Sequence, residues 1–159
     1  MVFNLQAKHN LAQEKVNSKA FDLTLRSLLS EPDQALAVDS LKQNLGTFTL
    51  LDARAREEYE VSHLQNARWV GYEDFEIGAV ADLPKETPLL VYCSIGYRSE
   101  KISQKLEAAG YSKVVNLYGG IFEWMNRGYP LFREGEETDR IHAYSRLWGI
   151  WLNRGEKVY

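Results

Sequence analysis

Short apolar runs bounded by turn residues recur through the middle of the chain and predict β-strands. They lie at residues 35–38, 47–51, 67–70, 89–92 and 113–117. The run at 89–92 is continuous, which is typical of a strand buried on both faces of its sheet. Helix-like segments separate the runs, and this alternation favours a parallel sheet covered by helices. The pattern therefore predicts an α/β domain.

Amphipathic spacing predicts the helices between these strands. Residues 10–29 carry apolar side chains at i, i+4, i+7 and i+8 from Phe21, and the Ser-Glu-Pro-Asp stretch at 30–33 ends the helix. The segment 99–109 repeats the pattern and is closed by Gly110. Further helices are expected at residues 39–45, 56–61 and 121–127.

The chain divides into a central domain with two appended pieces. We assign residues 1–34 to an N-terminal helical extension, residues 35–130 to the domain, and residues 131–159 to a C-terminal extension. A chain of 159 residues is long enough for one domain with such additions.

The C-terminal extension is expected to start with a charged linker, residues 131–140, and to continue as a helix over about 139–153. Tyr144, Trp148 and Trp151 fall on one stripe of that helix. The stripe either packs back onto the domain and the N-terminal helix, or forms a surface for a homodimer or another partner.

Composition and charge exclude several classes. The net charge is −3 and the pI about 5.7, so no basic excess exists for nucleic acid or a membrane surface. The chain has one cysteine and three separated histidines, which exclude an internal disulfide and argue against a metal site. The sequence starts without the apolar core of a signal peptide, so we expect a cytoplasmic protein. A chain whose signal peptide had been removed would look the same, so a periplasmic location is the alternative.

Candidate chemistry gathers at VYCSIGYRSEK, residues 91–101, where Cys93 ends the most apolar run. A loop from a strand into a helix turns backbone N–H groups inward, and the helix N-terminus adds positive charge. Gly96 permits an unusual backbone angle, and Arg98 adds a permanent cation. These features favour the nucleophilic thiolate at Cys93. The alternative is an inert cysteine packed at a strand end.

Three segments together resemble the rhodanese-like domain, a sulfurtransferase family. They are LLDARAREEYEVSHLQNARWV (50–70), VYCSIGYRS (91–99) and VVNLYGGIFEW (114–124). The resemblance implies a three-layer α/β sandwich around a mainly parallel five-stranded sheet. One departure is Gln65-Asn66, where the family often has proline and glycine.

The resemblance also implies the site and its reaction. Cys93 would carry a sulfane sulfur as a persulfide, and Arg98 would contact a small anionic donor such as thiosulfate. The substrate-binding loop would comprise Ser94, Ile95, Gly96, Tyr97, Arg98 and Ser99. No metal or organic cofactor is required. The acceptor, a thiol or a protein, must come from outside the chain because no second cysteine exists.

Two other functions stay open. Related phosphatases have C-x5-R, whereas this chain has C-x4-R from Cys93 to Arg98, and the shorter loop favours one sulfur atom over a phosphate ester. A non-catalytic interaction module is the second alternative, and the presence of Cys93 argues against it.

Neighbouring residues carry less specific expectations. Asp52 and Arg54 either line the edge of the pocket or form a structural ion pair, and Tyr97 lies either at the pocket rim or in solvent. Arg56, Glu57, Glu58 and Glu60 are expected on a solvated helix face. Gly119-Gly120 is expected to allow close backbone approach near the loop.

Overall fold

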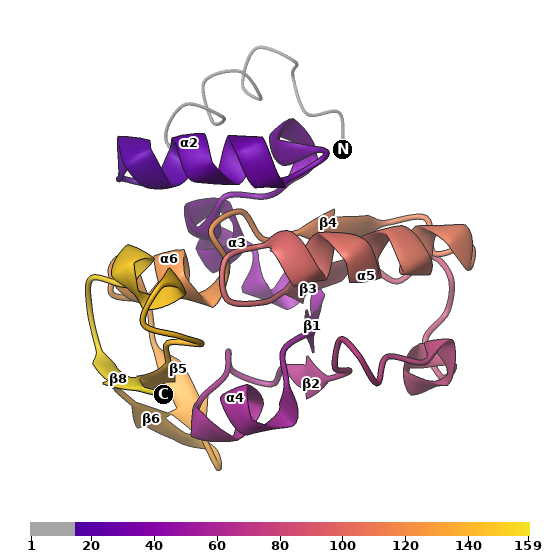
Figure 1. Cartoon of the computed structure of the whole chain (residues 1–159). Helices are drawn as coiled ribbons and strands as arrows, with labels where there is room; N and C mark the ends of the chain where they lie inside the picture. Colours follow the sequence, from indigo (N-terminus) through magenta and orange to yellow (C-terminus); the bar gives the residue numbers. More distant parts are fainter. Residues whose placement is uncertain (1–14) are drawn as a thin grey trace.

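A computed structural model describes residues 15–159 and contains a four-stranded parallel sheet. The strands are β1 (Thr49–Asp52), β2 (Arg68–Trp69), β3 (Leu89–Tyr92) and β4 (Val114–Asn116). Their spatial order is β2-β1-β3-β4, from the bottom to the top of the sheet in Figure 1. The predicted α/β class and parallel sheet are confirmed.

The expected fifth strand at residues 35–38 is reduced to one bridge. Leu36 pairs in parallel with Leu117, donating its N–H to the carbonyl of Asn116 and accepting from the N–H of Tyr118. The strand cannot extend because α3 (Val38–Gln43) begins two residues later. Five strands were predicted, and the sheet has four plus this bridge.

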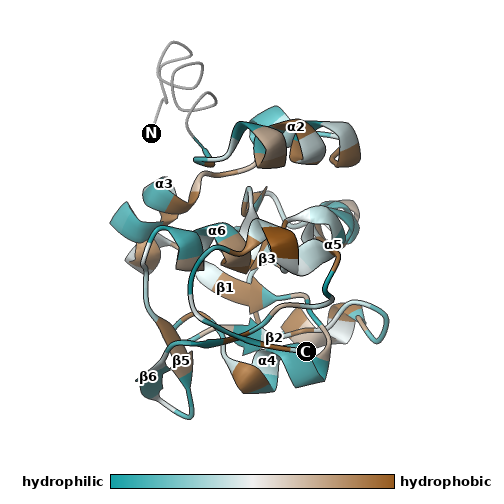
Figure 2. Ribbon diagram, turned by 60° about the vertical axis from the view of Figure 1, so that its left-hand side comes forward, coloured by the Kyte–Doolittle hydropathy of each residue, from teal (hydrophilic) through white to brown (hydrophobic). Residues whose placement is uncertain are grey.

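Helices cover both faces of the sheet, which gives the predicted three layers. On β3, Leu90 and Tyr92 face one hydrophobic cluster, which includes residues of α2 (Lys19–Leu28), α3 and α6 (Gly120–Asn126). Leu89 and Val91 face the other, which includes α5 (Tyr97–Ala108). Because successive strand residues alternate between faces, an unbroken apolar run fills both cores. Figure 2 shows the hydrophobic strands β1 and β3 in the interior.

The remaining short elements connect these layers. They are the helix α4 (Arg56–Val61) and the 3-10 turns η1 (Pro32–Gln34), η2 (Leu45–Thr47) and η3 (Ile77–Val80). The predicted helix at 10–29 is confirmed only over Lys19–Leu28, where Ser18 caps it by accepting the N–H of Phe21. Residues 10–14 of that prediction lie outside the described part of the chain.

The predicted charged linker at 131–140 is instead a β-hairpin. The strands β5 (Leu131–Arg133) and β6 (Glu136–Thr138) pair antiparallel. Glu134 and Gly135 both have positive φ, as a two-residue turn of type I′ requires.

The predicted C-terminal helix at 139–153 is wrong. The segment contains β7 (Arg140–His142) and the 3-10 turn η4 (Trp148–Trp151), and β7 pairs in parallel with β8 (Glu156–Val158). Apolar residues at helical spacing can also occur on a strand followed by a tight turn. Here the pairing of β7 with β8 outweighs the local conformational preferences of the aromatic residues.

Two of the three residues of the aromatic stripe, Trp148 and Trp151, are partly buried against the core, whereas Tyr144 is 49% exposed. The ring of Trp151 stacks on Phe21 of α2 with centroids 5.2 Å apart. Residues 15–34 and the C-terminal extension therefore pack into the same core as the central domain. The homodimer was expected to form through terminal helices, one of which does not exist, and it stays a prediction.

Candidate active site

Cys93 lies directly after β3, at the carboxyl end of the sheet, and α5 begins four residues later at Tyr97. The cysteine is 1% exposed. Its sulfur accepts the N–H of Gly96 at 3.1 Å, and the hydroxyl oxygen of Ser99 lies 3.3 Å from it. The strand, loop and helix order predicted from the sequence therefore places one backbone N–H and one hydroxyl group beside the sulfur.

Two side-chain bonds from β4 hold this loop. Asn116 donates its amide N–H to the carbonyl of Gly96 at 2.9 Å, and its Oδ1 lies 2.5 Å from Ser99 Oγ. Gly96 has φ +121°, a conformation that L side chains rarely adopt. Asn116 is 7% exposed, and the sequence analysis did not single it out although it falls inside the VVNLYGG segment.

The paired glycines bring α6 against the same loop, as predicted. The N–H of Ile121 donates to the carbonyl of Cys93 at 2.9 Å, and that of Phe122 to Ser94 at 3.1 Å. A Cβ on Gly120 would lie 2.5 Å from both carbonyl oxygens. This position therefore has no room for a side chain unless the loop moves.

Arg98 is held by an acid that the sequence analysis placed wrongly. Its guanidinium donates to both carboxylate oxygens of Glu58, at 2.7 and 2.9 Å, and also to Ser94 Oγ at 2.9 Å. Glu58 was expected on a solvated helix face but is 2% exposed. Its helix α4 lies against the loop, and only tertiary packing reveals which of its carboxylates points inward.

The charge balance of this pair follows from its burial. Burial opposes the ionisation of Glu58, but the hydrogen bonds and charge of Arg98 outweigh it, so the pKa of Glu58 is lowered from 4.5. Burial also opposes the charge on Arg98, but Glu58 and Cys93 raise its pKa. Both groups are ionised at neutral pH and neutralise each other.

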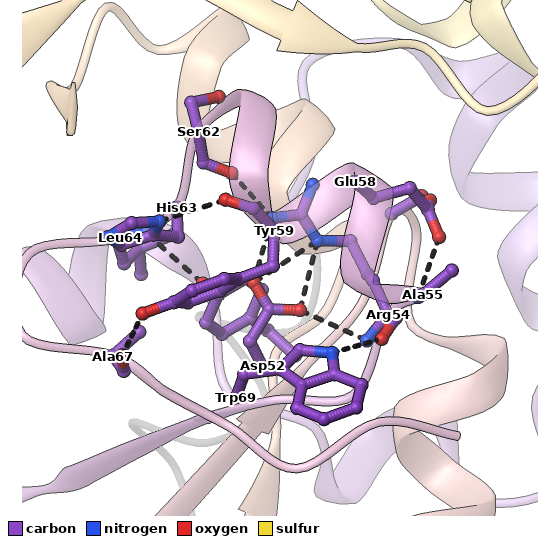
Figure 3. Close-up of polar contacts among 12 residues, drawn as sticks. Asp52, Arg54, Ala55, Glu58, Tyr59, Ser62, His63, Leu64, Ala67 and Trp69 are labelled. Atoms are coloured by element: carbon purple, nitrogen blue, oxygen red, sulfur yellow. Dashed lines mark hydrogen bonds and ion pairs between the residues drawn. The ribbon is translucent and has the colours of Figure 1, made fainter. Parts of the chain in front are cut away.

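Asp52 and Arg54 form a second, fully buried pair at the end of β1 (Figure 3). Arg54 donates from Nε and Nη2 to the carboxylate, and Nη2 also donates to the carbonyl of Ser62 at 2.6 Å. Among residues 15–159, Arg54 Nη1 is one of two buried side-chain polar atoms without a hydrogen-bond partner. The two sequence alternatives both hold for Arg54, because it is ion-paired and also lies in the cavity wall described next.

A cavity of about 690 Å³ opens beside the sulfur. Of the predicted site residues, six line it: Cys93, Ser94, Ile95, Tyr97, Arg98 and Arg54. Gly96, Ser99 and Asp52 lie behind this wall and act on its residues. Tyr97 is 41% exposed, so it lies at the rim and also contacts solvent.

Comparison with known proteins identifies the family. The family profile described as "Rhodanese-like domain" matches residues 37–127, more than half of the chain. The chain belongs to this family.

This rhodanese-like domain is similar to parts of several named proteins. It is 30% identical over 102 residues to the adenylyltransferase and sulfurtransferase uba4 of Ogataea parapolymorpha, covering 64% of this chain and 26% of that protein. It is 31% identical over 100 residues to thiosulfate sulfurtransferase 18 of Arabidopsis thaliana, and the match covers 55% of this chain and 74% of that protein. The chain thus spans about a quarter of the length of the first relative and most of the second.

Solved structures agree with the fold. The rhodanese-like domain of an Anabaena protein, determined by solution NMR, superimposes with a TM-score of 0.59 at 28% identity. The alignment covers 63% of this chain and 79% of that one.

Three residues outside the family match, Leu28, Tyr144 and Trp148, also line the cavity of this rhodanese-like domain. Tyr144 and Trp148 come from the C-terminal segment that was predicted to be helical. Tyr144 lies over Arg98, with the guanidinium carbon 4.9 Å from its ring centroid. The sequence analysis noted the aromatic stripe but did not connect it with Cys93.

Within residues 15–159, no group of three or more histidine, cysteine or acidic side chains comes together as a metal site would require. In the same part of the chain, no helix has the length and apolar character needed to span a bilayer.

Proposed function

We propose that this rhodanese-like domain is a sulfurtransferase that carries a sulfane sulfur as a persulfide on Cys93. The observation that carries the proposal is the cysteine sulfur itself, which accepts the Gly96 N–H and contacts the Ser99 hydroxyl at the wall of a cavity. Donors of this kind stabilise negative charge on sulfur both before and after a second sulfur is attached.

The first half of the reaction loads the cysteine. The thiolate of Cys93 attacks the outer sulfur of thiosulfate, and the sulfur–sulfur bond of thiosulfate breaks. Its electron pair leaves with sulfite, and the cysteine is left as a persulfide. No metal or organic cofactor enters this step. Similarity to a relative named as a thiosulfate sulfurtransferase supports thiosulfate as the donor.

The second half of the reaction removes the outer sulfur from the Cys93 persulfide. A nucleophilic acceptor, cyanide in an assay or a thiol, attacks the outer sulfur, and the electron pair of the broken bond returns to Cys93. The chain has one cysteine, so no internal thiol can resolve the persulfide. The acceptor is therefore a separate molecule or protein.

Intact mass spectrometry after incubation with thiosulfate tests the proposal. We expect a gain of one sulfur atom that cyanide removes, and no gain in Cys93→Ser, which keeps the size of the side chain without the thiol. If neither thiosulfate nor polysulfide loads the wild-type protein, the proposal is refuted in favour of a binding module. Hydrolysis of a phosphate ester dependent on Cys93 would instead indicate a phosphatase.

A further inference from the structure

Part of the cavity wall comes from the two extensions of the chain. Leu28, from α2, and Tyr144 and Trp148, from the C-terminal segment, all line the cavity beside Cys93. All three lie outside the segment 37–127 that matches the rhodanese-like family. This wall is therefore an addition of this chain to the family fold, located where a substrate would contact it.

The backbone holds Tyr144 in place over the cavity. The residue has φ +67°, which is uncommon for a side chain with a Cβ and costs free energy. Its N–H donates to His142 Nδ1 at 3.0 Å, and the pairing of β7 with β8 fixes the strand before it. Its ring lies over the guanidinium of Arg98 although the residue is 49% exposed. The ring is thus positioned by the surrounding structure, as expected of a residue that contacts a ligand.

Away from the Cys93 loop, whose donors would hold a small anion such as thiosulfate, the charges around the cavity do not favour a further anionic group. Three arginines and four carboxylates line it. Arg54 is paired with Asp52, and Arg98 with Glu58, so neither contributes uncompensated positive charge. A volume of about 690 Å³ also exceeds what one sulfur atom needs. The remaining lining is rich in aromatic side chains, which bind apolar and aromatic groups.

We propose that the sulfur acceptor is a small organic thiol with an uncharged aromatic or aliphatic body, seated on Tyr144 and Trp148. This inference rests on the proposed persulfide at Cys93. The acceptor thiolate attacks the outer sulfur, the bond from that sulfur to Sγ breaks, and its electron pair stays on Sγ. The products are the acceptor persulfide and the Cys93 thiolate, with no oxidant or reductant consumed.

The test compares two acceptors on the persulfide-loaded protein: phenylmethanethiol and its 4-carboxylate derivative. They share the reacting group and the aromatic ring and differ in one carboxylate, so the ratio of their kcat/KM values reports how strongly the wall disfavours a charged body. We expect phenylmethanethiol to react about tenfold better, and Tyr144→Ala or Trp148→Ala to lower that ratio severalfold. Leu147→Ala and Ile150→Ala are matched controls, since both residues are exposed and neither lines the cavity.

Each outcome is decisive. Failure of thiosulfate and polysulfide to load Cys93 refutes the proposed function. If Cys93 loads normally but the two acceptors have similar kcat/KM values, only the organic-acceptor inference is refuted. The same holds if the Tyr144 and Trp148 variants give the same ratio of kcat/KM values as the control variants. If either alanine variant does not fold, judged by far-ultraviolet circular dichroism and urea unfolding, Tyr144→Leu and Trp148→Leu replace it, and the wild-type ratio still tests the inference.

Discussion

The buried pair of Glu58 and Arg98 is open to a direct test of its contribution to stability. Glu58→Gln keeps the size and shape of the side chain but removes the charge. The side chains of Glu58 and Arg98 are 3% and 14% exposed, so water cannot replace the lost partner. Breaking a buried pair from one side costs about 3–5 kcal/mol. The amide oxygen can still accept one bond, so we expect a loss of about 2–4 kcal/mol in the free energy of unfolding.

Urea unfolding followed by circular dichroism measures this loss, and a fall in Tm of roughly 5–15 °C should accompany it. Glu60→Gln is the matched control. Glu60 is on the same helix and pairs with Arg56, but these side chains are 62% and 58% exposed. The control should change stability by less than about 0.5 kcal/mol.

The pH dependence gives a second readout of the same pair. The pKa of Glu58 is lowered from 4.5, because Arg98 outweighs the effect of burial. The pair therefore contributes its full stability above pH 4.5 and loses it as the pH falls through the lower, folded-state pKa. We expect the stability gap between wild type and Glu58→Gln to narrow on acidification. Equal stability of the Glu58 and Glu60 variants at pH 7 would refute this reasoning.

Three further predictions follow from the contacts around the site. Gly120→Ala should slow persulfide formation and destabilise the fold by about 1–3 kcal/mol, because its Cβ would lie 2.5 Å from two loop carbonyl oxygens. The control is Gly78→Ala, whose Cβ would have no atom within 4 Å and which should change neither the loading rate nor the stability. Asn116→Ala removes both side-chain bonds that hold the loop and should reduce the loading rate by about tenfold, followed by intact mass against time. Burial lowers the pKa of His142 from 6.5, so its folded state loses stability as the pH falls below 6.5. Replacement by Asn, whose oxygen can still accept the N–H of Tyr144, should remove that dependence from urea unfolding curves measured between about pH 5 and pH 7.5.

The central site could be predicted from the sequence because its information is local. The apolar run before Cys93, the glycine at 96 and the helix starting at Tyr97 are adjacent in the chain, and each has a strong conformational preference. The order of the strands then places the loop at the carboxyl end of the sheet.

The residues that act from a distance could not be found in the same way. Glu58 belongs to a run of charged residues, and nothing local distinguishes it from Glu57 or Glu60. Its burial arises only when α4 meets the loop that holds Arg98. Asn116 is similar, because a polar residue at the end of a strand has no evident role until the strand lies beside Gly96.

The C-terminal segment shows how periodicity misleads. Residues Ile141, Tyr144 and Trp148 are spaced as on a helix, but the chain there forms a strand, a positive-φ turn and a 3-10 turn. The pairing of β7 with β8 joins residues that are distant in the sequence, so the pattern of neighbouring residues does not reveal it.

The stacked rings of Phe21 and Trp151 join segments that lie near opposite ends of the described chain. Contacts between such distant positions form slowly, because the entropy cost of closing the intervening chain comes before the contact contributes any stabilising free energy. We therefore expect the sheet and the loop of Cys93 to assemble first and the C-terminal segment to dock last. Since Tyr144 and Trp148 would arrive with that segment, the Cys93 sulfur would gain its bond from Gly96 before the cavity gains these two aromatic side chains.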